Sequence, residues 1–88
     1  MPRQVLRWDV PVDDEIHPIG SGKVVMVGSR QPGVVEVWTD EADESVLVDR
    51  FVQVFAAGHL VPELATHIGS TIDGGTDRLV WHVFQVQA

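Results

Sequence analysis

The strongest constraint on this chain is the spacing of its apolar residues, which repeat at every second position in short runs and nowhere follow a helical spacing. In residues 5–12, Leu6, Trp8 and Val10 alternate with polar residues. Such alternation is typical of a strand with one face on a core. The pattern predicts a single all-β domain over residues 1–88, a small barrel or sandwich of about six short, mostly antiparallel strands. The strand-like runs are 5–12, 23–29, 34–40, 45–55, 66–72 and 78–86.

The segments between these runs predict how the strands connect. RQPG at residues 30–33 predicts a tight turn that makes a hairpin of residues 23–40. A closing hairpin is expected around DGGTD, where the Gly pair would supply positive φ angles. Pro11 limits pairing, so the first strand is expected to lie at a sheet edge or to end there. The remaining connections are predicted as turns at 13–22, a solvated acidic loop at 40–44 and at most one helical turn at 56–65.

Size and charge narrow the classes of function. A chain of 88 residues without cysteine has neither disulfides nor Cys-based zinc sites, and small folds without such links often self-associate, so a homo-oligomer is expected. The formal net charge of -7 would repel phosphate backbones, which argues against general nucleic-acid binding. The start of the chain has no signal-peptide h-region, and no apolar run is long enough to span a bilayer. We therefore expect a soluble protein with no membrane association.

The motifs that could carry catalysis or a cofactor are incomplete. GSGK at residues 20–23 ends like a phosphate-binding loop, but His17 and Val24 occupy positions where that loop needs Gly and Ser or Thr. The four histidines lack the i, i+4 spacing of a helical zinc site. No serine lies in a GxSxG sequence. The sequence therefore favours a protein that is not an enzyme and has no catalytic residue, cofactor or metal, although a site assembled from separate strands would leave no such motif.

Arg50 is the most informative charged residue. It lies in the run 45–55 among valines on one strand face, where an unpaired guanidinium would be costly to bury. One interpretation is a structural residue that forms a salt bridge or reaches solvent at the sheet edge. The other is an anion-binding or interface residue that uses the planar row of guanidinium donors.

The run RLVWHVFQV at residues 78–86 places Trp81 and His82 side by side in sequence. Strand alternation separates them onto opposite faces, so they are not expected to line one pocket together. Both faces of this run are mostly apolar, which predicts a central strand or one covered by a second subunit.

Four stretches, KVVMVG, VEVWTD, AAGHLVPELATHIGSTI and LVWHVF, resemble a family of small uncharacterised phage-encoded proteins. Typical members carry a strand ending in Pro, a G-K-[IL]-L-x-V-G strand, a G-x-G-H-x-[IV]-P segment, an [HY]-I-G-[ST] turn and a closing L-V-W-H-V-F strand. Here these correspond to Pro11, 22–28, 57–62, 67–70 and 79–84, so the resemblance covers nearly the whole chain. The chain departs from the pattern at Ala56 and Ala57, where a Gly-Thr-Gly-like loop is usual. The resemblance implies a phage origin and action in the host cytoplasm, and it implies no particular activity.

Three functions remain open from the sequence. The first is counter-defence by sequestering a small nucleotide signal, with guanidinium and ammonium groups on phosphate, imidazole donors and an aromatic face under a base. The second is a protein-binding inhibitor of a host factor that docks through a β-edge or the acidic loop 40–44. The third is a minor structural or assembly component of the virion. The candidate ligand-binding residues are Lys23, Arg50, His59, Trp81 and His82.

Overall fold

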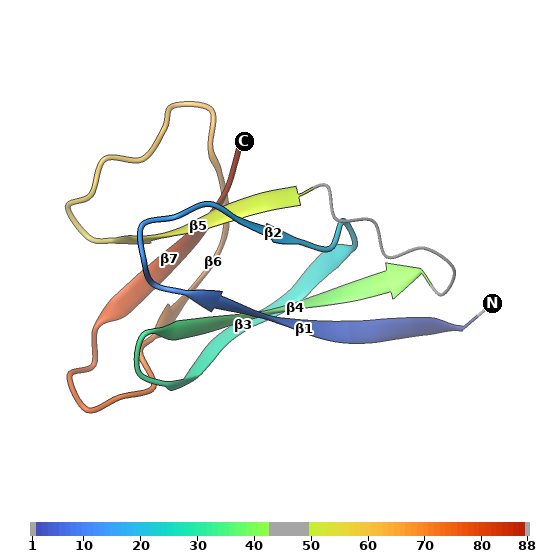
Figure 1. Ribbon diagram of the computed structural model, residues 1–88, viewed down its shortest axis with the longest axis horizontal. Helices are drawn as coiled ribbons and strands as arrows, with labels where there is room; N and C mark the ends of the chain where they lie inside the picture. The colour runs from blue at the N-terminus through green and yellow to red at the C-terminus, as the bar shows by residue number, and fades with distance from the viewer. Residues whose placement is uncertain (1, 43–49, 88) are drawn as a thin grey trace.

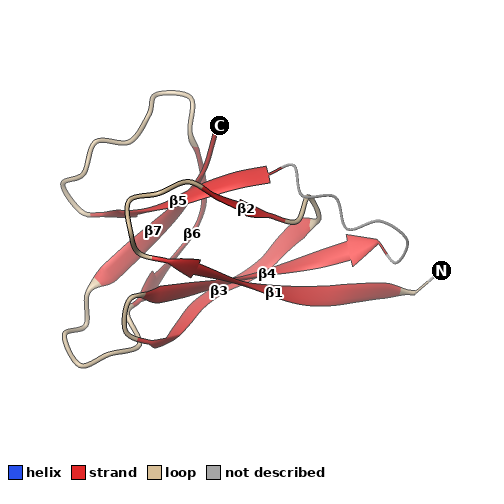
Figure 2. Ribbon diagram, in the orientation of Figure 1, coloured by secondary structure: helices blue, strands red, loops and turns tan. Residues whose placement is uncertain are grey.

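Seven strands form two antiparallel sheets in the computed structural model, which describes residues 2–42 and 50–87 (Figure 1, Figure 2). One sheet has the order β1-β4-β3 and the other has the order β2-β5-β7-β6. The described ranges contain no helix, and thus none long and apolar enough to cross a membrane. The strands are β1 (Arg3–Pro11), β2 (His17–Ile19), β3 (Lys23–Gln31), β4 (Val34–Ala42), β5 (Arg50–Ala56), β6 (Thr66–Ile72) and β7 (Val80–Val86).

The core lies between the two sheets and consists mainly of β-branched side chains. These suit strands because their restricted χ1 angles fit a pleated surface. Trp8 packs against this core, and its indole Nε1 donates to Thr39 Oγ1 at 2.8 Å, so its polar atom is satisfied between the sheets. The buried core residues are Val10, Ile19, Val35, Val37, Val52, Val54 and Val83.

The structure confirms the all-β class and several predicted connections. β1 lies at a sheet edge and ends at Pro11, and β3 and β4 form the predicted hairpin. β6 and β7 form the closing hairpin, with β7 central between β5 and β6. The predicted strand at 45–55 is observed from Arg50 onward, and residues 45–49 lie outside the described residues.

Two segments predicted as turn or loop are partly strand. β2, within 13–22, pairs with β5, and its Ile19 is buried in the core. Three residues are too few to show an alternating pattern, which is why the sequence did not reveal this strand. The acidic segment 40–44 begins as the end of β4, where Glu41 is 1% exposed and accepts hydrogen bonds from the Gly22 N–H at 3.1 and 3.0 Å. Asp43 and Glu44 lie outside the described residues.

The Gly pair of the β6–β7 connection has a different role from the one expected. The positive φ angle in this segment belongs to Arg78, at 57°. A Cβ on Gly74 would collide with backbone atoms of Arg30 and Gln31. Gly74 therefore serves close approach between this connection and the β3–β4 turn rather than an unusual φ angle.

Candidate functional site

Two of the predicted ligand-binding residues lie near each other, Arg50 at the start of β5 and Lys23 at the start of β3. Arg50 is the first described residue of β5, and its guanidinium donates to the carbonyl oxygens of Gly22 at 2.7 Å and Ser21 at 3.3 Å. Lys23 follows Gly22 directly in the chain. It is the first residue of β3 and pairs with Asp40 of β4. Two of the five guanidinium N–H donors of Arg50 thus bond the GSGK turn, which supports the structural interpretation of this residue.

The other three predicted residues lie at the opposite end of β5. Trp81 pairs with Ala56, and His82 pairs with Phe55. His59 lies three residues after Ala56, the last residue of β5. Six residue steps along β5 separate Arg50 from Ala56, about 20 Å at the rise of a strand. The five candidates therefore do not form one pocket. They divide into an Arg50–Lys23 group and a group of His59, Trp81 and His82.

Trp81 and His82 face opposite sides of β7, as the alternation predicts. Trp81 packs on the core, and its Nε1 donates to Asp73 Oδ1 at 2.9 Å. His82 lies on the outer face, where its Nδ1 is 2.6 Å from Ser70 Oγ. The hydrogen bond from Trp81, followed by those from the Gly33 and Gly75 N–H groups, holds the pKa of Asp73 below its ordinary value. Trp81 therefore belongs to a structural link between two turns, and His82 belongs to the outer surface.

A histidine–serine cluster, made of His67, Ser70 and His82, lies on this outer face. Ser70 Oγ is 2.8 Å from His67 Nε2, in addition to its contact with His82. His67 and Ser70 are three residues apart and would face opposite sides of a regular strand, but a register shift between His67 and Gly69 brings them onto one face. Sequence alternation alone missed this cluster because the bulge reverses the order of the faces.

The cluster carries hydrogen-bonding groups beside aromatic rings. Ser70 has one hydroxyl hydrogen, so one imidazole accepts from it while the other must donate to its oxygen. His67 packs edge-on against Phe84 at 5.2 Å between ring centroids, and Phe84 packs against Phe55 at 5.6 Å. Among the described residues, no carboxylate bonds either imidazole. The arrangement therefore lacks the orienting acid of a Ser–His–Asp triad.

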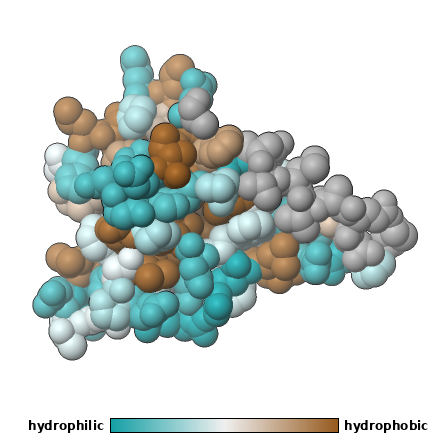
Figure 3. Space-filling model, in the orientation of Figure 1, coloured by the Kyte–Doolittle hydropathy of each residue, from teal (hydrophilic) through white to brown (hydrophobic). Residues whose placement is uncertain are grey.

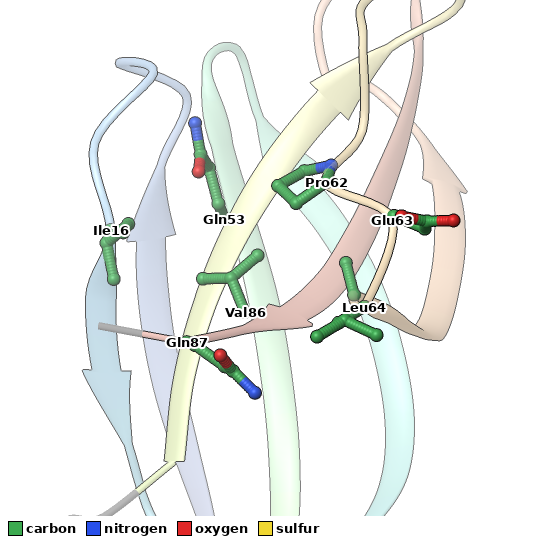
Figure 4. Close-up of a pocket in the computed structure, with 8 residues that line it drawn as sticks. Ile16, Gln53, Pro62, Glu63, Leu64, Val86 and Gln87 are labelled. Carbon is green, nitrogen blue, oxygen red and sulfur yellow. The ribbon is translucent and has the colours of Figure 1, made fainter.

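Two cavities that share Gln53 hollow the same face of the sheet. One, of about 370 Å³, is lined by side chains from the β1–β2 connection, β5, the 57–65 loop and the end of β7 (Figure 4). The other, of about 440 Å³, lies against Phe55 and His59. We call these two cavities together the loop groove. Their lining residues are Asp14, Ile16, Gln53, Phe55, Gly58, His59, Leu60, Pro62, Glu63, Leu64, Ala65, Val86 and Gln87.

The 57–65 loop is held at its base but projects apolar side chains. The Ala56 N–H donates to His59 Nδ1 at 3.2 Å, and His59 N–H donates to the Ala56 carbonyl at 3.1 Å. With Nδ1 as acceptor, the neutral His59 ring carries its proton on Nε2, which leaves that atom as a donor. Leu60 is 94% exposed and Leu64 is 75% exposed. Apolar residues, coloured brown, lie among hydrophilic ones at the upper left of Figure 3.

The rim of the loop groove is acidic. Asp13, Asp14 and Glu15 lie in the β1–β2 connection, and the Glu63 carboxylate points away from the other labelled side chains in Figure 4. A 2.8 Å hydrogen bond from His17 holds the pKa of Asp13 below its ordinary value, so this carboxylate stays charged. Neither 8–22 nor 51–77 contains a lysine or arginine. The groove thus combines apolar walls with a rim of one charge sign.

The described residues hold no group of three or more His, Asp or Glu side chains placed to bind a metal ion. The histidine–serine cluster contributes only two imidazoles. Of the stretches that carry the sequence resemblance, 67–70 and 79–84 pair in β6 and β7, and 57–62 supplies residues that line the loop groove.

Residues 1–88 match the family described as a domain of unknown function (DUF7352), and the chain belongs to this family. No curated protein and no solved structure matches the chain.

Proposed function

We propose that this DUF7352 protein is a non-enzymatic binding protein that docks on another protein through the loop groove. The observation that carries the proposal is the exposure of Leu60 and Leu64 beside an apolar-walled cavity on a sheet face. Exposed apolar groups that cluster beside a cavity mark interaction sites, whereas singly scattered ones need no explanation. The proposal includes the phage origin that the sequence resemblance implies, with the host cytoplasm as the location and a host protein as the partner.

The charge of the groove specifies the kind of partner. Asp14 and Glu63 line the groove, Asp13 and Glu15 flank Asp14 in the β1–β2 connection, and no lysine or arginine lies in the adjoining segments 8–22 and 51–77. A segment with an apolar anchor flanked by lysine or arginine would complement both the walls and the rim. We therefore prefer the groove as the docking surface to the described part of 40–44, where Asp40 pairs with Arg3 at 3.2 Å and Glu41 is buried.

Sequestration of a small nucleotide is the second candidate. It is favoured by the position of His59 and His82 beside the Phe55 ring on one sheet face, which offers imidazole donors near an aromatic surface. The two strongest cations of the sequence hypothesis, Arg50 and Lys23, lie at the other end of β5 and would not reach that ligand. For this reason we place this candidate second.

The test is capture and native mass spectrometry from infected host cells, followed by measurement of the purified complex. We expect a host protein to co-purify. We expect the double variant Leu60→Ser with Leu64→Ser to raise the dissociation constant of that complex about tenfold or more. Leu79→Ser is the matched control because Leu79 is also exposed but lies in the β6–β7 connection. Unchanged affinity in the double variant would refute the groove as the docking surface. A small added mass that is lost on denaturation would select the nucleotide candidate instead.

A further inference from the structure

β1 presents a long strand edge that no other described strand covers. It is the outer strand of the β1-β4-β3 sheet, and β4 alone pairs with it within residues 2–42 and 50–87 (Figure 1). Its nine residues pair with β4 in continuous register, without a bulge. An edge of free N–H and C=O groups is a template for another strand, and natural edge strands are usually short, bulged or covered. Among the described residues this edge is neither short, bulged nor covered, and its protection consists of the charges of Arg3, Arg7 and Asp9 and of Pro11 at its end. A partner strand must therefore match that order of charges.

We propose that a second copy of this chain is that partner, and that two β1 strands pair antiparallel about a two-fold axis at Leu6. The proposal goes beyond the docking function of the groove and gives the expected self-association a defined interface. It would join the two three-stranded sheets into one continuous sheet. A two-fold axis requires a self-complementary surface, so the side-chain order of β1 decides whether such pairing is feasible.

The side-chain order on the outer face of β1 fits this axis. Residues 3, 5, 7 and 9 share that face by alternation. Pairing about Leu6 sets Arg3 opposite the partner's Asp9, and Asp9 opposite the partner's Arg3. Opposite charges directly across an antiparallel pair are favourable. On the inner face, Leu6 meets its own copy, so the axis itself is apolar.

Neighbouring registers are disfavoured by like charges. An axis at Val5 would place Arg3 opposite the partner's Arg7, and an axis at Arg7 would place that residue against its own copy. An axis at Trp8 would shorten the overlap and bring Pro11, which has no N–H, into the ladder. The charge order of β1 therefore selects one register among those that keep its apolar face inward.

The groups needed for the contact are accessible in the single chain. The Arg3 side chain is 73% exposed in its pair with Asp40, and Asp9 is 48% exposed in its 3.2 Å pair with Arg7. Exposed pairs of this kind hold little free energy, so exchange for partners across the axis costs little. Val5 is 56% exposed and would lie opposite the partner's Arg7, so dimerisation would bury part of its exposed apolar surface.

The experiment uses two charge-reversal variants. Each is expected to form a weaker dimer alone, and the two are expected to dimerise with each other when mixed. In Arg3→Asp, two acids face each other across the axis, and in Asp9→Arg two arginines do. We expect the wild-type chain to dimerise in the micromolar range by light scattering, and each variant to weaken the dimer about tenfold or more. Mixed in equal amounts, the two variants restore both opposite-charge pairs. A heterodimer of intermediate mass should then appear by native mass spectrometry.

Circular dichroism of each variant checks that the loss of dimer is not a loss of fold. Arg78→Asp, in the β6–β7 connection, and the double groove variant Leu60→Ser with Leu64→Ser should dimerise like the wild type. A monomeric wild-type chain, a single reversal that dimerises normally, or a mixture that stays monomeric would each overturn the proposal. Because the groove variant is scored separately, failure here leaves the docking function to its own test.

Discussion

At the scale of single residues, the clearest device is Asp73, which ties the β6–β7 connection to the β3–β4 turn. Its Oδ1 accepts from Gly33 N and Trp81 Nε1, both at 2.9 Å, and its Oδ2 accepts from Gly75 N at 2.8 Å. Three donors on one carboxylate favour the charged form, and this lowers the pKa of Asp73 from 3.8. One short side chain thereby fixes two turns and the orientation of the central-strand tryptophan.

This lowered pKa has a defined consequence for stability. Because the pKa is lower in the folded than in the unfolded chain, Asp73 contributes stability that is fully present above pH 3.8 and is lost as the pH falls through the folded value. Asp73→Asn would place an amide N–H₂ toward a donor, so we expect the variant to have a lower Tm than the wild type at pH 7. We expect the difference in Tm between the two to be smaller below pH 3.8. Thermal unfolding at both pH values measures this. Asp77→Asn is the control in the same connection, and an unchanged gap at low pH would exclude this linkage.

At the scale of elements, β6 depends on a glycine where it meets β3. A Cβ on Gly69 would lie 2.6 Å from Val27 Cγ2 and 3.1 Å from Val27 Cβ, and both are atoms of a stiff branched side chain. Gly69 also ends the bulge that brings His67 and Ser70 onto one face. Gly69 thus permits the close approach of the edge strands β3 and β6, and it also shapes the geometry of the histidine–serine cluster.

We expect Gly69→Ala to destabilise the fold by about 1–3 kcal/mol, the usual cost of overpacking. Gly28→Ala is the matched strand control, since a Cβ there would meet only the flexible end of Met26 at 3.4 Å. Urea unfolding gives both free energies. If the two substitutions cost the same, the contact between β3 and β6 does not limit the packing of this edge.

Elements also show what the sequence could predict. Alternation predicted the strand in β1, while Pro11 predicted its place at a sheet edge and RQPG predicted the β3–β4 hairpin. The apolar faces of β7 left two options, a central strand or one covered by a second subunit, and the structure shows it central. Alternation could not locate β2, which has three residues, or the bulge in β6, which reverses the faces. The loop groove was equally hidden, since Ile16, Gln53 and Leu64 are far apart in sequence and meet only when the 57–65 loop folds beside the sheet.

At the scale of the whole molecule, charge is distributed unevenly over a small surface. The chain carries 13 acidic residues against 6 lysines and arginines, and none of those six lies in residues 8–22 or 51–77, which supply most of the groove lining and its rim. A net charge far from zero destabilises the compact state through self-repulsion, and the acids of residues 8–22 and 51–77 have no lysine or arginine within those segments. A surface kept acidic at this cost agrees with a role for the rim in attracting a basic partner.

Salt should relieve that repulsion, because the Debye length shortens to about 10 Å at 0.1 M ionic strength. We expect the Tm of the wild-type protein to rise from low to physiological salt at pH 7. The variant with Asp14→Asn, Glu15→Gln and Glu63→Gln reduces the formal net charge from -7 to -4 by removing three acids. The Tm of this variant should rise less with salt than that of the wild type. Neutralising Asp40, an acid paired with Arg3, should leave the rise of Tm with salt as large as in the wild type. Equal salt responses in the rim variant and the wild type would show that the repulsion arises elsewhere and that the rim acids do not destabilise the fold.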